Sequence, residues 1–104
     1  MKTKEELPAC PVATAVSLIG GKWKMQILCS LYNNGPTRYN QLKKTLDGVS
    51  NTVLANALRE LEGDGLVHRQ EYLEVPVRVE YAITEPCRQL IPILDALGDW
   101  SMAL

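Results

Sequence analysis

The sequence is poor in the residues that build metal centres and disulfide frameworks. It contains one histidine and three cysteines, Cys10, Cys29 and Cys87, which are far apart in the chain. An odd number of cysteines without close spacing argues against a small secreted domain held by disulfides. Because there is no Cys-x-x-Cys pair and no histidine cluster, we expect no metal site, and we interpret His68 as structural.

Other absences narrow the class of protein further. No apolar run approaches the ~18–20 residues that span a membrane. The first residues, MKTKEELPAC, are polar and lack the apolar segment of a signal peptide, so we expect a cytoplasmic protein without a membrane partner. We find no nucleophile–base pair, phosphate-binding loop or paired carboxylates, and therefore expect neither an enzyme nor a bound cofactor.

The charge is nearly balanced over the whole chain but unevenly distributed along it. The 104 residues are enough for one domain and carry a net charge of −1, which is not typical of a nucleic-acid binder. Residues 20–70 hold seven Lys or Arg against four acids, or +3, and the remainder holds four against eight, or −4. This basic middle is compatible with a surface that faces phosphates. We expect residues 1–9 to form a flexible arm and residues 10–104 to form a single domain.

One segment, VSNTVLANALRELEGDGLVHR at residues 49–69, contains the pattern of a helix with two unlike faces. Leu54, Leu58 and Leu61 recur at helical spacing, and Ser50 is suited to cap the helix N-terminus. The opposite face of the first two turns carries short polar side chains, where a solvated helix usually carries Glu and Lys. Taken alone, this pattern allows either a surface helix of a small bundle or a DNA recognition helix, whose N-terminal residues reach base edges.

The flanking patterns predict a winged helix-turn-helix, an α+β fold that is mostly α. Thr84 is suited to cap a last helix that runs towards Met102. Thr37 is suited to cap the helix expected over residues 38–46. We expect Tyr39 to point inward and Cys29 to lie in the core. Helical spacing and turn residues predict four earlier helices, over residues 11–19, 22–32, 38–46 and 51–62. Alternating apolar residues predict a two-stranded wing over residues 66–72 and 77–84.

The last helix carries an apolar stripe that consists of Leu90, Ile93, Leu94, Leu97 and Trp100. This stripe either closes the core of the monomer or forms a dimer interface. We favour the dimer, because apolar helices at both ends of the chain exceed what a small winged unit can bury. The N- and C-terminal helices are therefore expected to form the dimer interface together.

Six motifs follow one another along nearly the whole chain. They are CPV at residues 10–12, LIGGKWKMQIL at 18–28, GPTRYNQL at 35–42, LRELEGDGLVHR at 58–69, EVPVRVEYAIT at 74–84 and LDALGDW at 94–100. In combination they resemble the HxlR-type winged helix-turn-helix transcriptional regulators of the MarR-like superfamily. The resemblance implies a homodimer that binds palindromic operator DNA and regulates neighbouring genes, and we expect a repressor. In many members the cysteine of the CPV motif senses oxidants or electrophiles, which corresponds to Cys10.

Three positions depart from the pattern of the family that the chain resembles. Asn51-Thr52 stand where a Gln-Lys pair is common, which removes a cation from the face expected to read DNA. Tyr39 stands where a Phe is usual, and Cys87 stands where a Gly is usual at the start of the last helix. None of these changes alters the expected fold, but Cys87 adds a second candidate thiol near a helix N-terminus.

We interpret the polar face of the 51–62 helix as the surface that reads double-stranded DNA. Asn can pair with adenine, and Thr or Ala can contact a thymine methyl group. Arg59 either reaches the DNA or pairs with a nearby acid, and Arg78 near the wing tip is placed to reach a phosphate or the minor groove. The candidates for base contact are Ser50, Asn51, Thr52, Ala55, Asn56 and Arg59. The candidates for phosphate contact are Lys22, Arg38, Asn40, Lys43 and Arg78.

Cys10 has two interpretations. It is either a small buried residue, as free cysteines often are, or a thiolate favoured by the partial positive charge at the start of a helix. In the second case a quinone, an aldehyde or a peroxide is the effector, and Cys87 is the alternative sensor. The alternative function for the whole chain is a winged-helix module that binds another protein without affinity for DNA.

Overall fold

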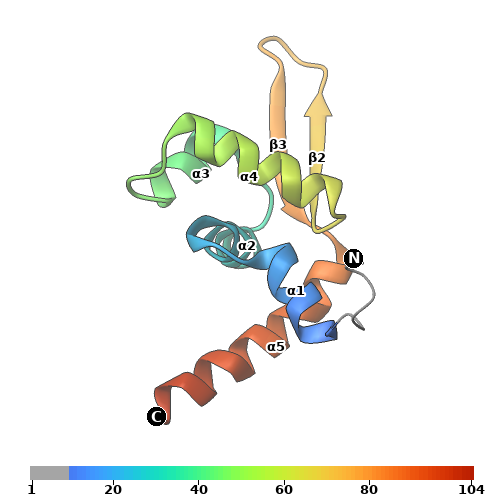
Figure 1. Cartoon of the computed structure of the whole chain (residues 1–104). Coiled ribbons are helices and arrows are strands. Elements are labelled where there is room, and N and C mark those ends of the chain that lie inside the picture. Colours follow the sequence, from blue (N-terminus) through green and yellow to red (C-terminus); the bar gives the residue numbers. More distant parts are fainter. Residues whose placement is uncertain (1–9) are drawn as a thin grey trace.

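The computed structural model describes residues 10–104, which form five helices and a small sheet of three strands (Figure 1). The order is α1 (Pro11–Ile19), α2 (Lys22–Asn34), β1 (Thr37–Arg38), α3 (Tyr39–Thr45), α4 (Asn51–Gly63), β2 (Val67–Tyr72), β3 (Arg78–Ile83) and α5 (Glu85–Met102). This is the mostly helical, winged arrangement that the sequence predicts. The arm expected over residues 1–9 lies outside the described residues.

Two helices begin at the capping residues that the sequence predicts. The Val53 N–H donates to Ser50 Oγ at 3.1 Å, at the start of α4. The Cys87 N–H donates to Thr84 Oγ1 at 3.4 Å, at the start of α5. Each side chain thereby satisfies a first-turn amide that has no partner within its own helix.

The predicted stop after α4 is also present, and it directs the chain into the wing. Gly65 has a φ of 81°, in the left-handed region that favours glycine. This turn lets the Leu66 N–H donate to the Leu61 carbonyl at 2.9 Å. β2 then begins at Val67, directly behind the C-terminal end of α4.

The core is formed by the inner faces of α2, α3 and α4 together with the start of α5. The largest fully buried side chains are Ile27, Leu28, Leu31, Leu42, Leu54, Leu58, Leu61 and Cys87. Truncating one of the buried leucines to alanine is expected to cost about 2–5 kcal/mol of unfolding free energy. Because the leucines of α4 are inside, the polar face of this helix is held outward.

The prediction that Cys29 lies in the core is wrong, because its side chain is exposed. Successive residues of a helix are rotated by about 100° about its axis. Leu28 and Leu31 point into the core from α2, and this rotation carries Cys29 to the solvent side.

The wing belongs to an antiparallel sheet of three strands in the order β1-β3-β2, and not to the predicted two-stranded ribbon. β1 pairs with β3 through Thr37 opposite Tyr81 and Arg38 opposite Glu80. The prediction that Thr37 caps α3 is therefore wrong. Its Oγ1 donates instead to the Gly35 carbonyl at 2.7 Å. A two-residue strand is too short to give an alternating pattern in the sequence.

α5 extends away from the rest of the domain, so that its C-terminal half projects into solvent (Figure 1). Within its apolar stripe, Leu90 and Leu94 are half-buried, whereas Ile93, Leu97 and Trp100 are 63%, 53% and 61% exposed. Val12 and Val16 of α1 are also exposed. Leu90 and Leu94 pack against the core, whereas the exposed side chains of α1 and α5 do not contribute to it. Among the described residues, no helix is long and apolar enough to span a membrane.

Candidate nucleic-acid interface

The first two turns of α4 present a polar surface to solvent. Asn51, Thr52, Asn56 and Arg59 are exposed there, and Ala55 is half-buried between them. Ser50 is exposed at the start of the same surface, and its hydroxyl caps the helix. The predicted base-contact residues therefore lie together. They offer two amides, hydroxyl groups and a guanidinium, which are groups that recognise base edges in the major groove.

Arg59 and Asn56 form a hydrogen-bonded pair on this surface. The Arg59 Nη1 donates to Asn56 Oδ1 at 2.7 Å. The sequence left open whether Arg59 pairs with an acid, and within residues 10–104 its polar partner is this amide. Because the amide is neutral, the positive charge of Arg59 stays on the outer face of α4.

Tyr39 connects α3 to the start of α4, which sequence reasoning missed. Its ring packs against the core, as predicted. Its hydroxyl shares its single hydrogen between two acceptors, the backbone oxygen of Asn51 at 3.1 Å and the side-chain Oδ1 of Asn51 at 3.3 Å. The first residues of α3 and α4 are thus joined at the end of α4 that is expected to read DNA.

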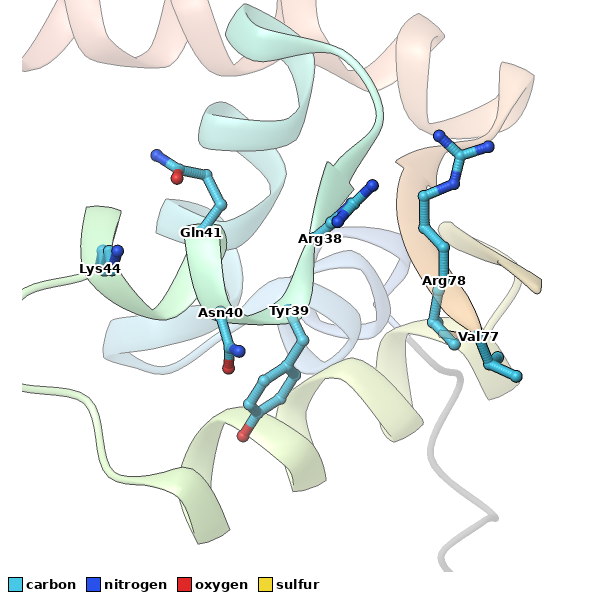
Figure 2. Close-up of a pocket in the computed structure, with 8 residues that line it drawn as sticks. Arg38, Tyr39, Asn40, Gln41, Lys44, Val77 and Arg78 are labelled. Carbon is cyan, nitrogen blue, oxygen red and sulfur yellow. The ribbon is translucent and has the colours of Figure 1, made fainter. Parts of the chain in front are cut away.

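An open groove of about 420 Å³ lies between α3 and the first residues of β3, near the tip of the wing. Figure 2 shows Arg38 and Arg78 on neighbouring strands beside this groove, with Tyr39 extending toward α4. Lys44 adds a third cation to the lining. The predicted phosphate candidate Lys43 is half-buried and is not part of the lining. The lining residues are Arg38, Tyr39, Asn40, Gln41, Lys44, Val77, Arg78 and Val79.

The three cations of the groove are not equivalent. Arg38 and Lys44 are exposed, and no acid pairs with either of them within the part of the chain that the structure describes. Arg78 is half-buried, lies between the carboxylates of Glu74 and Glu80, and stacks on the ring of Tyr72 at 4.0 Å. Arg38 and Lys44 are therefore better placed than Arg78 to attract a phosphate to this groove.

A second, smaller hollow of about 250 Å³ lies on the other side of α4. Lys22 and Asn56 both line it, so the predicted phosphate candidate on α2 is next to the polar surface of α4. The ammonium group of Lys22 lies 4.7 Å from the centre of the Trp23 ring, which orients it without neutralising it. In the same hollow, Lys24 Nζ is 2.6 Å from Glu60 Oε1, and this ion pair lowers the pKa of Glu60.

The three cysteines are in different environments. Cys10 is exposed and precedes the first turn of α1, where the Thr14 N–H donates to its carbonyl at 3.0 Å. Cys87 is buried, and burial raises the pKa of its thiol, with a smaller contribution from the neighbouring Cys29. A raised pKa leaves less thiolate at neutral pH, so Cys87 is the poorer candidate for a reactive thiol.

This geometry defines a class of protein. α3 and α4 form a helix-turn-helix, β2 and β3 form the wing beside it, and the exposed helix is equipped for base edges, as in a winged helix-turn-helix DNA-binding protein. The model of the HxlR-like helix-turn-helix family matches residues 18–104, and the chain belongs to this family of transcriptional regulators. Its relatives are regulators and not enzymes, as the sequence predicts.

The similarity extends over most of the chain. The chain is 46% identical over 91 residues to an uncharacterized HTH-type transcriptional regulator from Methanothermobacter thermautotrophicus. The match covers 88% of this chain and 69% of that protein. The structure is similar to that of the redox regulator HypR in its oxidized form, with a TM-score of 0.82 and 38% identity over 91% of this chain and 97% of HypR. It is also similar to the reduced transcriptional regulator YodB from B. subtilis, with a TM-score of 0.82 and 34% identity over 90% of this chain and 92% of YodB.

Proposed function

We propose that this regulator is a homodimer that binds a palindromic operator through α4 and represses the adjacent gene until an oxidant or electrophile modifies Cys10. The observation that carries the DNA-binding role is the polar outer face of the first two turns of α4. Buried leucines behind this face prevent the helix from rotating, so its amides and guanidinium are displayed in a fixed orientation. A helix held in this way can enter the major groove with its N-terminal end.

The flanking cations suit the two phosphate backbones of that groove. Arg38, Asn40 and Lys44 lie on the wing side of α4, and Lys22 lies on its other side. We assign phosphate contacts to these residues and base contacts to the polar residues of α4. This division separates the contacts that position the protein from those that determine sequence preference.

Dimerisation is supported by the apolar side chains that one protomer leaves uncovered. Ile93, Leu97 and Trp100 of α5 and Val12 and Val16 of α1 are more than half exposed. An uncovered apolar stripe of this kind is typical of a protein–protein contact, and a second copy offers the same stripe. A two-fold dimer places two copies of α4 in successive major grooves, which explains the preference for a palindrome.

Redox control is supported by the exposure of Cys10 at the N-terminus of α1 and by the redox regulator HypR among the similar structures. The thiolate of an exposed cysteine can attack an electrophilic carbon or a peroxide. Because α1 contributes to the proposed dimer contact, a modified Cys10 can alter the distance between the two copies of α4.

The experiment that tests the proposal is a titration of the protein on a duplex from the region upstream of its own gene. The result expected is specific binding at nanomolar concentration that weakens steeply between about 50 and 200 mM salt, because phosphate contacts release counterions. Binding that a random duplex of equal length competes equally well would contradict the proposal. That result would favour the alternative of a winged-helix module that binds another protein.

A further inference from the structure

The hydrogen bonds between Tyr39 and Asn51 occupy a particular atom of the reading surface. Asn51 is the first residue of α4, and its side chain is exposed. The Tyr39 hydroxyl lies 3.3 Å from its Oδ1 and 3.1 Å from its backbone oxygen, so both acceptors of this residue face α3. The Tyr39 ring is packed against the core and therefore cannot follow the side chain if Asn51 turns away.

A carboxamide normally offers one acceptor and two donors. The carbonyl oxygen has two lone pairs, and the Tyr39 hydroxyl takes one of them and holds the oxygen toward α3, so the NH₂ group is the part that is turned toward a ligand. Recognition of adenine by asparagine uses both atoms, because the amide oxygen accepts from N6 while the amide nitrogen donates to N7. Guanine presents two acceptors, N7 and O6, and no donor on the same edge.

We propose that Tyr39 is a positioning residue that makes Asn51 a hydrogen-bond donor, so that Asn51 selects guanine and not adenine in the operator. The inference rests on the proposed role of α4 as the reading helix and specifies the base that one of its residues reads. The neighbouring pair is arranged in the same way, since Arg59 occupies Asn56 Oδ1 at 2.7 Å. The outer face of α4 is thus rich in donors, which matches the acceptor-rich edge of guanine.

The test is the selection of bound duplexes from a pool of randomised double-stranded DNA, followed by titration on the selected duplex and its single-base variants. Asn51→Ala identifies the base pair that Asn51 reads. At this pair the variant no longer distinguishes the four bases, whereas the wild type does. Tyr39→Phe removes only the hydroxyl group. Tyr32→Phe removes a hydroxyl from a partly exposed tyrosine of α2 and is the matched control.

We expect guanine at the base pair identified by Asn51→Ala. Tyr39→Phe lowers the preference for guanine over adenine at this pair by at least about fivefold and changes the other base pairs by less than about twofold. The double variant Tyr39→Phe/Asn51→Ala shows no loss beyond that of Asn51→Ala alone. Asn51→Asp, which keeps Oδ1 but has no amide hydrogens, loses the preference as fully as Asn51→Ala. Tyr32→Phe matches the wild type.

Several results would overturn the inference. One is a wild-type preference for adenine at the identified base pair. Another is an undiminished preference of Tyr39→Phe for guanine over adenine. A third is a base preference that Asn51→Ala leaves unchanged at every pair. A loss spread evenly over all base pairs, together with a lower melting temperature of Tyr39→Phe, would show that Tyr39 only stabilises the fold and would also overturn it. A wild-type protein that selects no sequence at all contradicts the proposed function itself, which distinguishes the two failures.

Discussion

Arg78 Nη2 lies 2.9 Å from Glu74 Oε2, and Nη1 of the same guanidinium lies 3.5 Å from Glu80 Oε2. Two carboxylates on the wing thus compensate the charge of its half-buried arginine. A compensated guanidinium attracts phosphates weakly, because the field of the carboxylates opposes its own. The sequence predicts that Arg78 contacts DNA, and because both carboxylates hold its guanidinium, we expect this contact to form only when one of them releases it.

Replacing Glu74 with glutamine is therefore expected to strengthen DNA binding. Glu74→Gln removes one carboxylate from Arg78 and leaves its guanidinium free to contact a phosphate. One added phosphate contact steepens the slope of log K against log salt by up to ~0.9. Fluorescence anisotropy on the upstream duplex over a range of salt concentrations measures both effects. Glu71→Gln is the control, because it removes the same charge from the wing but Glu71 pairs with Arg69, at 3.9 Å. Equal gains in both variants would show that only the net charge of the wing matters.

Truncation of Asn56 is expected to weaken specific binding more than non-specific binding. Asn56→Ala removes an amide from the reading surface and also the acceptor that orients Arg59. We expect a loss of about 1–3 kcal/mol on a genuine operator and little change on random DNA. Titration of both duplexes measures the difference, with Glu62→Ala near the C-terminal end of the same helix as control. Wild-type affinity of Asn56→Ala for the operator would contradict the assignment of α4 as the reading helix.

The apolar stripe of α5 predicts that a charge at Leu97 dissociates the dimer. Leu97 is 53% exposed in one protomer, so Leu97→Glu leaves the fold of that protomer intact. Loss of one buried leucine from each subunit, at about 1.5–3 kcal/mol each, raises the dimer dissociation constant by roughly 100-fold or more. Sedimentation velocity measures the association state. Gln89→Glu introduces the same charge outside the stripe and should stay dimeric, whereas a dimeric Leu97→Glu would place the interface elsewhere.

If Cys10 senses oxidants or electrophiles, the two exposed thiols, Cys10 and Cys29, should differ in their effect on DNA binding after treatment with an electrophile. Cys10→Ser should bind DNA with wild-type affinity but keep that affinity after treatment with p-benzoquinone, whereas wild-type protein and Cys29→Ser should lose it. The electrophile forms a carbon–sulfur bond with the Cys10 thiolate, which intact-mass measurement detects. Loss of DNA binding by treated Cys10→Ser would reject Cys10 as the sensor and direct attention to Cys87.

The ion pair between Lys24 and Glu60 predicts a pH-dependent contribution to stability. The hydrogen bond and the charge of Lys24 lower the pKa of Glu60 from 4.5, so the folded state favours the carboxylate. The contribution is therefore fully present above about pH 4.5 and is lost as the pH falls through the lowered pKa of the folded state. Glu60→Gln should melt at a lower temperature than wild type at pH 7, with the difference shrinking toward pH 3. Glu62→Gln, whose carboxylate has no ion pair among the described residues, serves as control and should show no such trend.

The local features of the fold were predictable because they depend on neighbours in the chain. Ser50 and Thr84 cap their helices as expected, because a cap needs only a hydroxyl at a helix start. The leucine stripe of α4 is buried as its spacing indicates. Periodicity was less informative where an element was short, which is why β1 was missed and Thr37 was given the wrong role.

Contacts between distant segments were not predictable, since the sequence does not say which side chains meet. Tyr39 and Asn51 both depart from the pattern of the family that the chain resembles, yet only the packing of α3 against α4 brings them into hydrogen-bonding contact. The exposure of Cys29 depends in the same way on the face of α2 that the other helices cover.

The amino-acid sequence alone determined the class of fold, the position of the helix that is proposed to read DNA and the polar groups on its outer face. These follow from helical spacing, turn residues and capping, which act within a few residues. The tertiary structure alone decided which of the candidate DNA-contacting groups, on α4 and on the elements beside it, are free to act. It confines Arg78 between two carboxylates, leaves Arg38 and Lys44 open and turns the oxygen of Asn51 toward Tyr39. The physical reason is that the availability of a charge or a hydrogen-bonding group depends on its partners in space, and folding brings those partners from other segments of the chain.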